Sequence, residues 1–449
     1  MRKLFGTDGI RAVAGVAPLD PTTVYAIGIA LGHSLKATFP HPRVLLGMDT
    51  RESGGWIAAA MADGLKYSHA EVISAGVITT PAIAHLARKH GFAAGVVISA
   101  SHNPWEDNGI KIFGSDGYKL ADATELRMED EIFRHLEGLV APDPATLPPP
   151  QVDPLLRREY EEFLLAAVPG LNLAGLKLVI DCANGAASAI APELFASPGG
   201  EVRLTHVTPD GRNINDQCGA LYPKVVAAET KASGAAMGIT FDGDADRALF
   251  ADANGNVVNG DAVLLLAARD LQQKNQLTGN LVVATTMSNM GLEAALKRSG
   301  IRMLRAPVGD KYVLELMQQE NAALGGEQSG HILFPHLATT GDGLLTALVV
   351  LDLVQRSGKP LHELCADLKV FPQVIVNVRV KEKRPLESIA TVAATIHAAE
   401  EELKDSGRVV IRYSGTEALA RVMIEAESEE AMRRHADAIA GAIRAELGV

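Results

Sequence analysis

The stretch GVVISASHNP, residues 95–104, decides how the chain folds around it. Its first half is apolar and rich in β-branched side chains, which is typical of a buried strand, and its second half is small, polar and loop-forming. Open α/β sheets bind their ligands in the crevice beyond the carboxyl ends of the strands. We therefore expect a strand that places the hydroxyls of Ser99 and Ser101 in such a crevice, with Ser101 as the candidate nucleophile.

Strand-like and helix-like segments alternate along the chain before this stretch. A helical pattern at 21–35 precedes a strand-like run at 44–47, and Ser53 is a suitable N-cap for the next helix. A strand at 71–74 and a helix from Pro81 then lead into the serine stretch. This alternation predicts an α/β fold with a mostly parallel, doubly wound sheet and short loops.

The same passage from an apolar run to a polar loop recurs at 178–185, 237–247 and 281–289. Each recurrence predicts another α/β module that directs a loop toward a ligand, although the modules share no repeat of residue identity. The chain has 449 residues, about three times the roughly 150 residues of a typical domain. We therefore expect three or four domains.

Two changes in composition mark the domain organisation. Residues 141–154 contain six prolines and little apolar periodicity, which indicates a linker. From about Phe371 the pattern becomes an alternating strand at 374–380, an amphipathic helix at 386–396, two further strands and a last helix over 430–447. This β-α-β-β-α order predicts a small α+β domain.

Charge and cysteine content exclude several classes of function. The net charge of −12 argues against generic binding to nucleic acid or to anionic membranes. The three cysteines lie far apart, which favours neither a disulfide framework nor a zinc site. The longest apolar run, 344–354, is interrupted by Asp352 and is too short to cross a bilayer, and the charged N-terminus has no leader-like apolar segment. We expect a cytoplasmic protein.

Three carboxylates at alternate positions, Asp242, Asp244 and Asp246, predict a metal site. Hard divalent cations prefer oxygen ligands, and a glycine-containing loop can turn all three side chains toward one ion. An EF-hand is excluded because Arg247 and Ala253 stand where that loop needs Gly and Glu. A solvated acidic turn is disfavoured by repulsion among the three charges.

The acidic loop is open to two chemical interpretations. In one, Asp242 is the nucleophile of a phosphatase of the haloacid-dehalogenase type, which leaves the serine loop without a role. In the other, Mg²⁺ on the three carboxylates also accepts a phosphate oxygen from a phosphorylated Ser101. A phosphoserine carries a charge of roughly −1.5 to −2, which such an ion would largely neutralise.

Three further polar residues are candidates near Ser101. Lys111 follows it by ten residues, close enough to fold back on its phosphate. His102 is either a base or a structural hydrogen-bonding residue. Arg11, in the loop FGTDGIR at 5–11, either holds an anion or covers a domain edge.

Two glycine-containing loops later in the chain suit a phosphorylated sugar. The loop GGEQSGH at 325–331 offers a carboxylate, an amide, a hydroxyl and an imidazole, which fit sugar hydroxyls but also an ordinary turn. The loop RYSGTE at 412–417 offers a guanidinium, hydroxyls and backbone N–H groups, the components of a phosphate nest. A Walker A motif and a G-x-G-x-x-G motif are both absent, which argues against a kinase or a dehydrogenase.

Taken together, the motifs resemble the α-D-phosphohexomutase superfamily over essentially the whole chain. The matching motifs, in chain order, are GTDGIR at 6–11, SASHNP at 99–104, NGIK at 108–111, the acidic loop at 242–247, GEQSGH at 326–331 and RYSGTE at 412–417. Further segments are similar to the branch that acts on glucosamine phosphates: RKLFGTDG at 2–9, VGDKYV at 308–313, Gln328 and TTGDG at 339–343. Three small residues, Ala12, Ala245 and Ala418, depart from the usual pattern and put loop geometry rather than activity in question.

The resemblance implies four domains around a central cleft. The expected boundaries are 1–152 with the phosphoserine loop, 153–253 with the metal loop, 254–366 with the sugar loop and 367–449 with the phosphate loop. The first three would be doubly wound α/β domains and the last a smaller α+β domain.

The resemblance also implies an activity, the interconversion of glucosamine 6-phosphate and glucosamine 1-phosphate, which supplies UDP-N-acetylglucosamine and cell-wall precursors. Phosphoserine 101 would donate its phosphoryl group and give a sugar 1,6-bisphosphate intermediate, with one Mg²⁺ on Ser101, Asp242, Asp244 and Asp246. The rival activity within the superfamily is that of a phosphomannomutase or phosphoglucomutase. A non-catalytic phosphosugar sensor is a further alternative, and a homodimer is an expected assembly.

The implied roles of the remaining residues follow the motifs. Lys111 and Arg11 would assist at the reacting phosphate, and His331 would either position the sugar or take part in proton transfer. The sugar hydroxyls would contact Glu327 and Ser329. The phosphate that does not react would be held by Arg412, Ser414, Gly415, Thr416 and Arg421.

Overall fold

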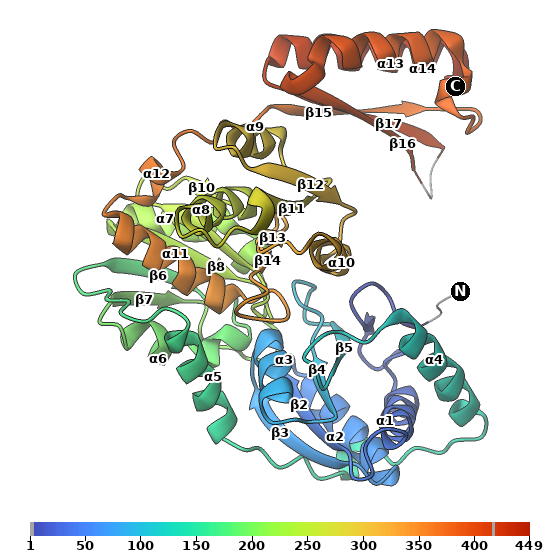
Figure 1. Cartoon of the computed structure of the whole chain (residues 1–449). Helices are drawn as coiled ribbons and strands as arrows, with labels where there is room; N and C mark the ends of the chain where they lie inside the picture. The colour runs from blue at the N-terminus through green and yellow to red at the C-terminus, as the bar shows by residue number, and fades with distance from the viewer. Residues whose placement is uncertain (1–3, 415–417) are drawn as a thin grey trace. The chain divides into compact units, whose positions relative to one another are not determined.

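The computed structural model describes residues 4–414 and 418–449, which form two compact units (Figure 1). The larger unit comprises the chain up to Thr286 together with residues 305–364. The smaller unit comprises residues 287–304 together with residues 365–449.

The first sheet of the larger unit has five strands in the order β1-β5-β4-β2-β3. Its strands are β1 (Ile10–Val13), β2 (Arg43–Met48), β3 (Glu71–Val77), β4 (Ala94–Ile98) and β5 (Asp107–Gly114). Strand β2 is parallel to β3 and β4, as predicted, but β5 is antiparallel to both β4 and β1. The loop between β4 and β5 is too short for the helical crossover that a parallel connection needs, so the sheet is mixed.

Helices cover both faces of this sheet. They are α1 (Pro21–Lys36), α2 (Gly54–Tyr67), α3 (Thr80–Lys89) and α4 (Asp122–Leu136). Alternate residues of β4 face opposite sides, because successive side chains of a strand point in opposite directions. Val96 and Ile98 share a core with α1, α2 and α4, whereas Gly95 faces Ile83 of α3.

A second sheet has the same arrangement of strand directions as the first, except that its antiparallel edge strand comes last in the sequence and not first. Its order is β10-β9-β8-β6-β7, with β6 parallel to β7 and β8, and β9 antiparallel to β8 and β10. Its strands are β6 (Lys177–Asp181), β7 (Glu201–Thr205), β8 (Met237–Phe241), β9 (Ala248–Asp252) and β10 (Val257–Val258). The nearby helices are α5 (Leu155–Ala166), α6 (Ala191–Ala196) and α7 (Pro223–Ser233).

The third sheet has four strands in the order β12-β11-β13-β14 and follows the same plan. Strand β13 is parallel to β11 and antiparallel to β14. Its strands are β11 (Leu281–Thr285), β12 (Arg302–Ala306), β13 (Gly325–Gly326) and β14 (Ile332–Leu333). The helices of this part of the chain are α8 (Gly260–Gln273), α9 (Met290–Arg298), α10 (Asp310–Glu320), α11 (Gly343–Ser357) and α12 (Leu361–Leu364). The serine loop, the acidic loop and the sugar loop therefore leave corresponding strands, β4, β8 and β13.

The C-terminal part has the predicted β-α-β-β-α order. Its elements are β15 (Gln373–Arg379), α13 (Ala390–Leu403), β16 (Gly407–Tyr413), β17 (Leu419–Ala426) and α14 (Glu429–Leu447). The antiparallel sheet has the order β15-β17-β16, and both helices pack on one of its faces, where Val422, Ile424 and Ile439 are fully buried (Figure 1). The predicted α+β domain is confirmed.

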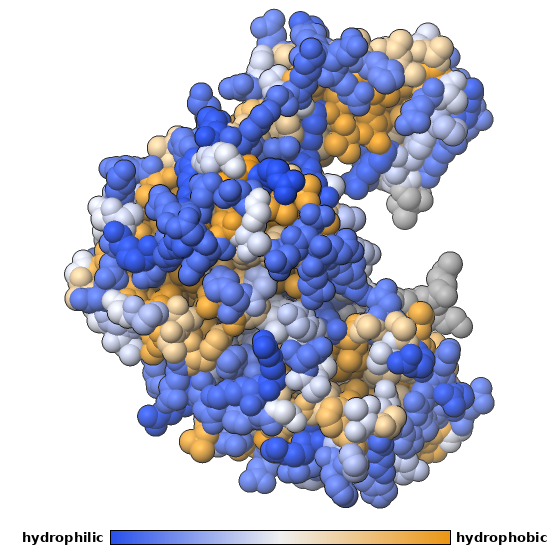
Figure 2. Space-filling view, viewed as in Figure 1, coloured by the Kyte–Doolittle hydropathy of each residue, from blue (hydrophilic) through white to orange (hydrophobic). Residues whose placement is uncertain are grey.

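Surface and core composition agree with the sequence. Hydrophilic residues predominate on the face seen in Figure 2, and apolar residues form smaller patches. Among the described residues, no helix is long and apolar enough to cross a membrane. Cys182 and Cys218 are buried, and neither forms a disulfide bond.

Candidate active site

Polar loops that follow β4, β8 and β13 of the larger unit line one cavity of about 360 Å³. The loop after β4 contributes His102, and the loop after β8 contributes Asp246 and Arg247. The loop after β13 contributes Glu327 and His331. Asp8 and Arg11 add the amino-terminal loop to the wall. Loops that lie far apart in the sequence are thus brought together around one cavity.

The serine loop holds Ser101 in an unusual backbone conformation. Its φ of 53° lies in the left-handed region, which residues with a Cβ seldom adopt. The Ser101 N–H donates to Ser99 Oγ over 2.9 Å, and Ser99 Oγ donates to the buried Asp49 over 2.6 Å. The buried Ser101 hydroxyl in turn donates to Asp242 Oδ2 over 2.6 Å. The predicted nucleophile and the predicted metal loop are therefore in direct contact.

Asp242, Asp244 and Asp246 form a buried carboxylate cluster in which each offers an oxygen within 4.8 Å of the others. Burial and the two neighbouring carboxylates raise the pKa of Asp242 to about 8. Within the described parts of the chain, the buried Oδ1 of Asp244 accepts no hydrogen bond. A divalent cation would satisfy that oxygen and relieve the repulsion, so the three residues fit Mg²⁺.

Ala245 stands in this loop where the resemblance has glycine. Its φ of 56° lies in the left-handed region, which costs an L-residue roughly 1–2 kcal/mol. Two bonds hold the turn in spite of the side chain: the Ala245 N–H donates to the Asp242 carbonyl over 3.0 Å, and its own carbonyl accepts from the Gly343 N–H over 2.9 Å. The loop accommodates the alanine.

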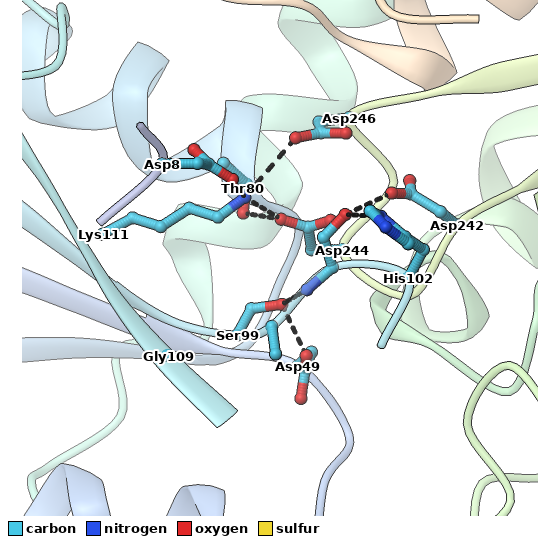
Figure 3. Close-up of polar contacts among 12 residues, drawn as sticks. Asp8, Asp49, Thr80, Ser99, His102, Gly109, Lys111, Asp242, Asp244 and Asp246 are labelled. Atoms are coloured by element: carbon cyan, nitrogen blue, oxygen red, sulfur yellow. Dashed lines mark hydrogen bonds and ion pairs between the residues drawn. The ribbon is translucent and has the colours of Figure 1, made fainter. Parts of the chain in front are cut away.

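Lys111 points its ammonium from β5 into the carboxylate cluster (Figure 3). Its Nζ lies 2.8 Å from Asp244 Oδ2, 3.5 Å from Asp246 Oδ2 and 3.1 Å from Asp8 Oδ2. Burial alone would lower the pKa of Lys111, but the carboxylates outweigh it and raise that pKa well above its ordinary value. A permanently charged ammonium therefore lies beside the acidic loop.

Further charges link the amino-terminal loop to its surroundings. Asp8 forms ion pairs with Arg11 and with Lys119, and Lys119 also pairs with Asp310 at the start of α10. Arg11 donates from Nη1 to the Ala100 carbonyl over 3.4 Å. The structure thus places Arg11 against the serine loop.

The sugar loop presents Glu327 and Ser329 together. Glu327 accepts the Gly309 N–H at Oε1 over 3.0 Å, and Ser329 Oγ donates to Glu327 Oε2 over 3.2 Å. The amide of Gln328 points elsewhere, since its Nε2 donates to Asp261 over 3.1 Å. Glu327 lines the cavity, whereas Gln328 supports the loop from outside the cavity lining.

The two histidines of the site have opposite electrostatic surroundings. His331 lies 3.5 Å from Asp246 and 3.7 Å from Asp310, and although burial would lower its pKa, these carboxylates raise it to about 9. Burial and nearby guanidinium groups lower the pKa of His102 to about 4. His102 Nδ1 lies 3.3 Å from Ser101 Oγ.

The smaller unit brings together part of the predicted phosphate site. Arg412 of β16 and Arg421 of β17 are directly opposite partners in the sheet. Ser414 follows β16, and its carbonyl accepts a bond from Lys383 Nζ over 2.6 Å, which adds a cation that the sequence patterns do not reveal. Gly415 and Thr416 lie outside the described residues.

Other residues of the site also escape the sequence patterns. Arg247 lines the cavity within 4.0 Å of Asp242, although in the sequence it only rules out an EF-hand. Arg51 pairs with Asp49 and donates from Nη2 to the Ser101 carbonyl over 3.1 Å. Asn215 donates to the same carbonyl over 3.0 Å. The polar loop that follows β2 is a sequence signal that could have found Arg51, whereas no such signal exists for Asn215.

Family models match nearly the whole chain. They describe phosphoglucomutase/phosphomannomutase alpha/beta/alpha domains I, II and III, at residues 2–138, 159–255 and 259–371, and the C-terminal domain at residues 375–442. The four matches follow one another along the chain, and each covers most of one of the four described sheets.

Known relatives and solved structures agree with this assignment. A phosphoglucosamine mutase from Koribacter versatilis is 60% identical, with 100% of this chain and 98% of the relative covered, and one from Solibacter usitatus is 51% identical, with 100% and 99% covered. The fold is similar to that of a phosphoglucomutase/phosphomannomutase family protein from Burkholderia thailandensis (TM-score 0.78, 24% identity, 99% of each chain). It is also similar to N-acetylphosphoglucosamine mutase from Aspergillus fumigatus, solved with GlcNAc-6P and magnesium (TM-score 0.60, 20% identity, 99% and 96% covered). The chain therefore belongs to the phosphoglucosamine mutase family, within the α-D-phosphohexomutases.

Proposed function

We propose that this chain is an intramolecular phosphotransferase that interconverts glucosamine 6-phosphate and glucosamine 1-phosphate. The observation that carries the proposal is the 2.6 Å bond from the Ser101 hydroxyl to Asp242. It joins a nucleophile from one module to a buried carboxylate cluster from the next. The product would supply the synthesis of UDP-N-acetylglucosamine and of cell-wall precursors.

The reaction would pass through two phosphoryl transfers. In the first, the bond between phosphorus and Ser101 Oγ breaks, and a new bond forms to the free hydroxyl of the sugar, which gives a 1,6-bisphosphate. In the second, the other phosphoryl group returns to Ser101 Oγ. Mg²⁺ held by Asp242, Asp244 and Asp246 would neutralise charge on the transferring group.

The residues of the larger unit would position both reactants. Lys111 and Arg11 would hold oxygens of the reacting phosphate, since one ammonium and one guanidinium lie beside the serine and acidic loops. Glu327 and Ser329 would accept and donate hydrogen bonds with sugar hydroxyls. His331, which lies between Asp246 and Asp310, would orient the sugar or carry its proton.

The smaller unit would hold the phosphate that does not react. Its proposed ligands are Arg412, Ser414, Gly415, Thr416 and Arg421. Gripping this phosphate would help to exclude water, which competes with the sugar for the phosphoryl group.

The proposal extends to the setting of the enzyme. We place it in the cytoplasm, as a homodimer that binds phosphosugars, with a sugar 1,6-bisphosphate as activator. The domain boundaries are proposed after residues 152, 253 and 366.

A substrate panel and a mass measurement test the proposal. Ratios of kcat/KM for glucosamine, glucose and mannose 6-phosphates are expected to favour glucosamine, and a preference for either other sugar would instead support a phosphoglucomutase or phosphomannomutase. Intact-mass analysis before and after phosphatase treatment is expected to reveal one acid-stable phosphate that Ser101→Ala abolishes. An active Ser101→Ala variant with a hydroxylamine-labile phosphate would support Asp242 as the nucleophile instead.

A further inference from the structure

We propose that Asn215 is a positioning residue for phosphoryl transfer, because its amide holds the backbone of the serine loop where the Ser101 hydroxyl faces Asp242. This inference rests on the proposed function, in which Ser101 carries the transferred group. It assigns a role to a residue that has no place in the recognised motifs.

Asn215 and Arg51 hold the same two carbonyl groups. Asn215 Nδ2 donates to the carbonyl oxygens of Ser101 over 3.0 Å and of Asn103 over 3.1 Å. Arg51 Nη2 donates to the same oxygens, over 3.1 Å and 2.6 Å. Each carbonyl oxygen has two acceptor sites, so the two side chains satisfy both carbonyls completely. Both side chains are buried, which shields these bonds from competing water.

The two donors come from different modules. Arg51 follows β2 of the first sheet, whereas Asn215 lies between β7 and β8 of the second sheet, the sheet that also carries the acidic loop. The bonds from Asn215 therefore fix the serine loop relative to the module that bears Asp242. The hydroxyl of Ser101 reaches Asp242 across this same contact, over 2.6 Å.

The hydrogen bonds from Asn215 and Arg51 can hold the strained backbone of the serine loop in place. Ser101 has a φ of 53°, and such conformations persist only where the surroundings hold them firmly. Asn215 is itself well suited to its place, since its own φ is 59° and asparagine tolerates the left-handed region better than most residues. Its N–H donates to the Ala183 carbonyl over 2.9 Å, and this bond holds Asn215 in the second module.

The amide also lies against the metal loop. A Cβ placed on Gly243 would come within 3.0 Å of Asn215 Nδ2 and within 2.5 Å of the Ser101 carbonyl oxygen. The serine loop, the amide of Asn215 and the backbone of the acidic loop are therefore packed in direct contact. A small displacement of the amide would therefore change the distance between the Ser101 hydroxyl and the carboxylate cluster.

Two substitutions suit the test because both tolerate a positive φ. Asn215→Asp keeps the shape of the side chain but replaces the donor with an oxygen that faces two carbonyl oxygens. Asn215→Gly removes the side chain without straining the backbone. Asn213→Ala is the matched control, since Asn213 lies in the same loop and its Nδ2 donates to the Thr208 carbonyl over 3.1 Å and not to the serine loop.

The experiment follows a single turnover. Each protein is phosphorylated with glucose 1,6-bisphosphate, checked by intact mass, mixed with glucosamine 6-phosphate and Mg²⁺, and quenched at intervals to follow the loss of phosphoserine. We expect Asn215→Asp and Asn215→Gly to transfer about a hundredfold more slowly, because displacements near 1 Å cost about that factor. KM and Mg²⁺ affinity should stay close to wild type, and Asn213→Ala should match wild type throughout.

Three outcomes would overturn the inference. The first is a wild-type transfer rate in Asn215→Gly, and the second is an equal slowing of transfer in Asn213→Ala. The third is a loss of Mg²⁺ affinity in the Asn215 variants in proportion to the slowing, which would indicate a merely structural role for Asn215. The proposed function has a separate criterion. If wild-type protein cannot be phosphorylated on Ser101, the proposed function fails, whereas if wild type and both Asn215 variants all discharge normally, only the role of Asn215 fails.

Discussion

Gly243→Ala adds a single methyl group where the acidic loop meets the serine loop. A Cβ at this position would lie 2.5 Å from the Ser101 carbonyl oxygen, 2.8 Å from the δ-methyl of Ile214 and 3.0 Å from Asn215 Nδ2. Ordinary contacts of a Cβ begin near 3.4 Å. The Ser101 carbonyl must therefore move by about 0.9 Å, or the acidic loop must retreat by a similar distance.

The magnitudes predict a folded but slow enzyme. Overpacking of this kind costs about 1–3 kcal/mol of unfolding free energy, which is less than the roughly 5–15 kcal/mol that stabilises a typical protein. A misplacement close to 1 Å at reacting groups costs about a hundredfold in rate. We therefore expect kcat to fall by about that factor while the protein remains folded.

The assay measures conversion of glucosamine 6-phosphate together with urea denaturation. Gly441→Ala, in the interior of α14, is the control because a Cβ there meets no atom within 4 Å. The control should gain roughly 0.5–1 kcal/mol of stability, since alanine favours a helix more than glycine does, and its kcat should not change. Retention of kcat by Gly243→Ala within about threefold of wild type would refute the close contact between the two loops.

Three other perturbations follow from the structure. Asp244→Asn should weaken Mg²⁺ binding because it removes one of three ligand charges, and an unchanged metal titration would exclude Asp244 from the ligand set. Tyr160→Phe should lower the free energy of unfolding by about 1–3 kcal/mol, measured in urea, because the buried Tyr160 hydroxyl donates to Asp342 over 2.6 Å and its loss leaves that carboxylate oxygen unsatisfied. His85 should make the protein less stable in mild acid. Burial and neighbouring cations lower its folded-state pKa to about 4, so the unfolded chain, with a pKa of about 6.5, takes up the proton first as pH falls between these values. The loss should be about 1 kcal/mol near pH 5 after allowance for partial solvent exposure, and His85→Gln should lose correspondingly less stability over the same range.

Local patterns predict those parts of the site that a single segment builds. The change from apolar to polar residues at 95–104 predicts both β4 and the polar loop that carries Ser101, and the structure confirms the strand. The alternate acids at 242–246 predict a carboxylate cluster, which the structure contains. In each case the strand and the loop that follows it fix the geometry, so the local sequence is sufficient to predict it.

Sequence patterns do not predict the contacts that a residue makes with a different module. The sequence predicts Lys111 near Ser101, but its burial within β5 is explained only by contacts with Asp8 and the acidic loop, which lie in other parts of the sequence. Asn215 meets Ser101 across 114 residues, from a segment without helical or strand periodicity. Hydrophobic periodicity reports which face of an element is buried, and it carries no information about polar contacts between loops.

The glycines around the acidic loop show why inter-loop contacts are hidden in the sequence. A glycine that directly follows Asn or Asp usually marks a turn, and Gly185 and Gly343 both fit that interpretation. In the structure, however, a Cβ on Gly185 would lie 2.3 Å from the Gly243 carbonyl oxygen, and one on Gly343 would lie 2.4 Å from the Arg247 carbonyl oxygen. Neither glycine has a positive φ, so their small size serves the close approach of another loop rather than their own conformation. The close packing of loops around the acidic loop therefore requires glycines whose small size serves a contact with another loop.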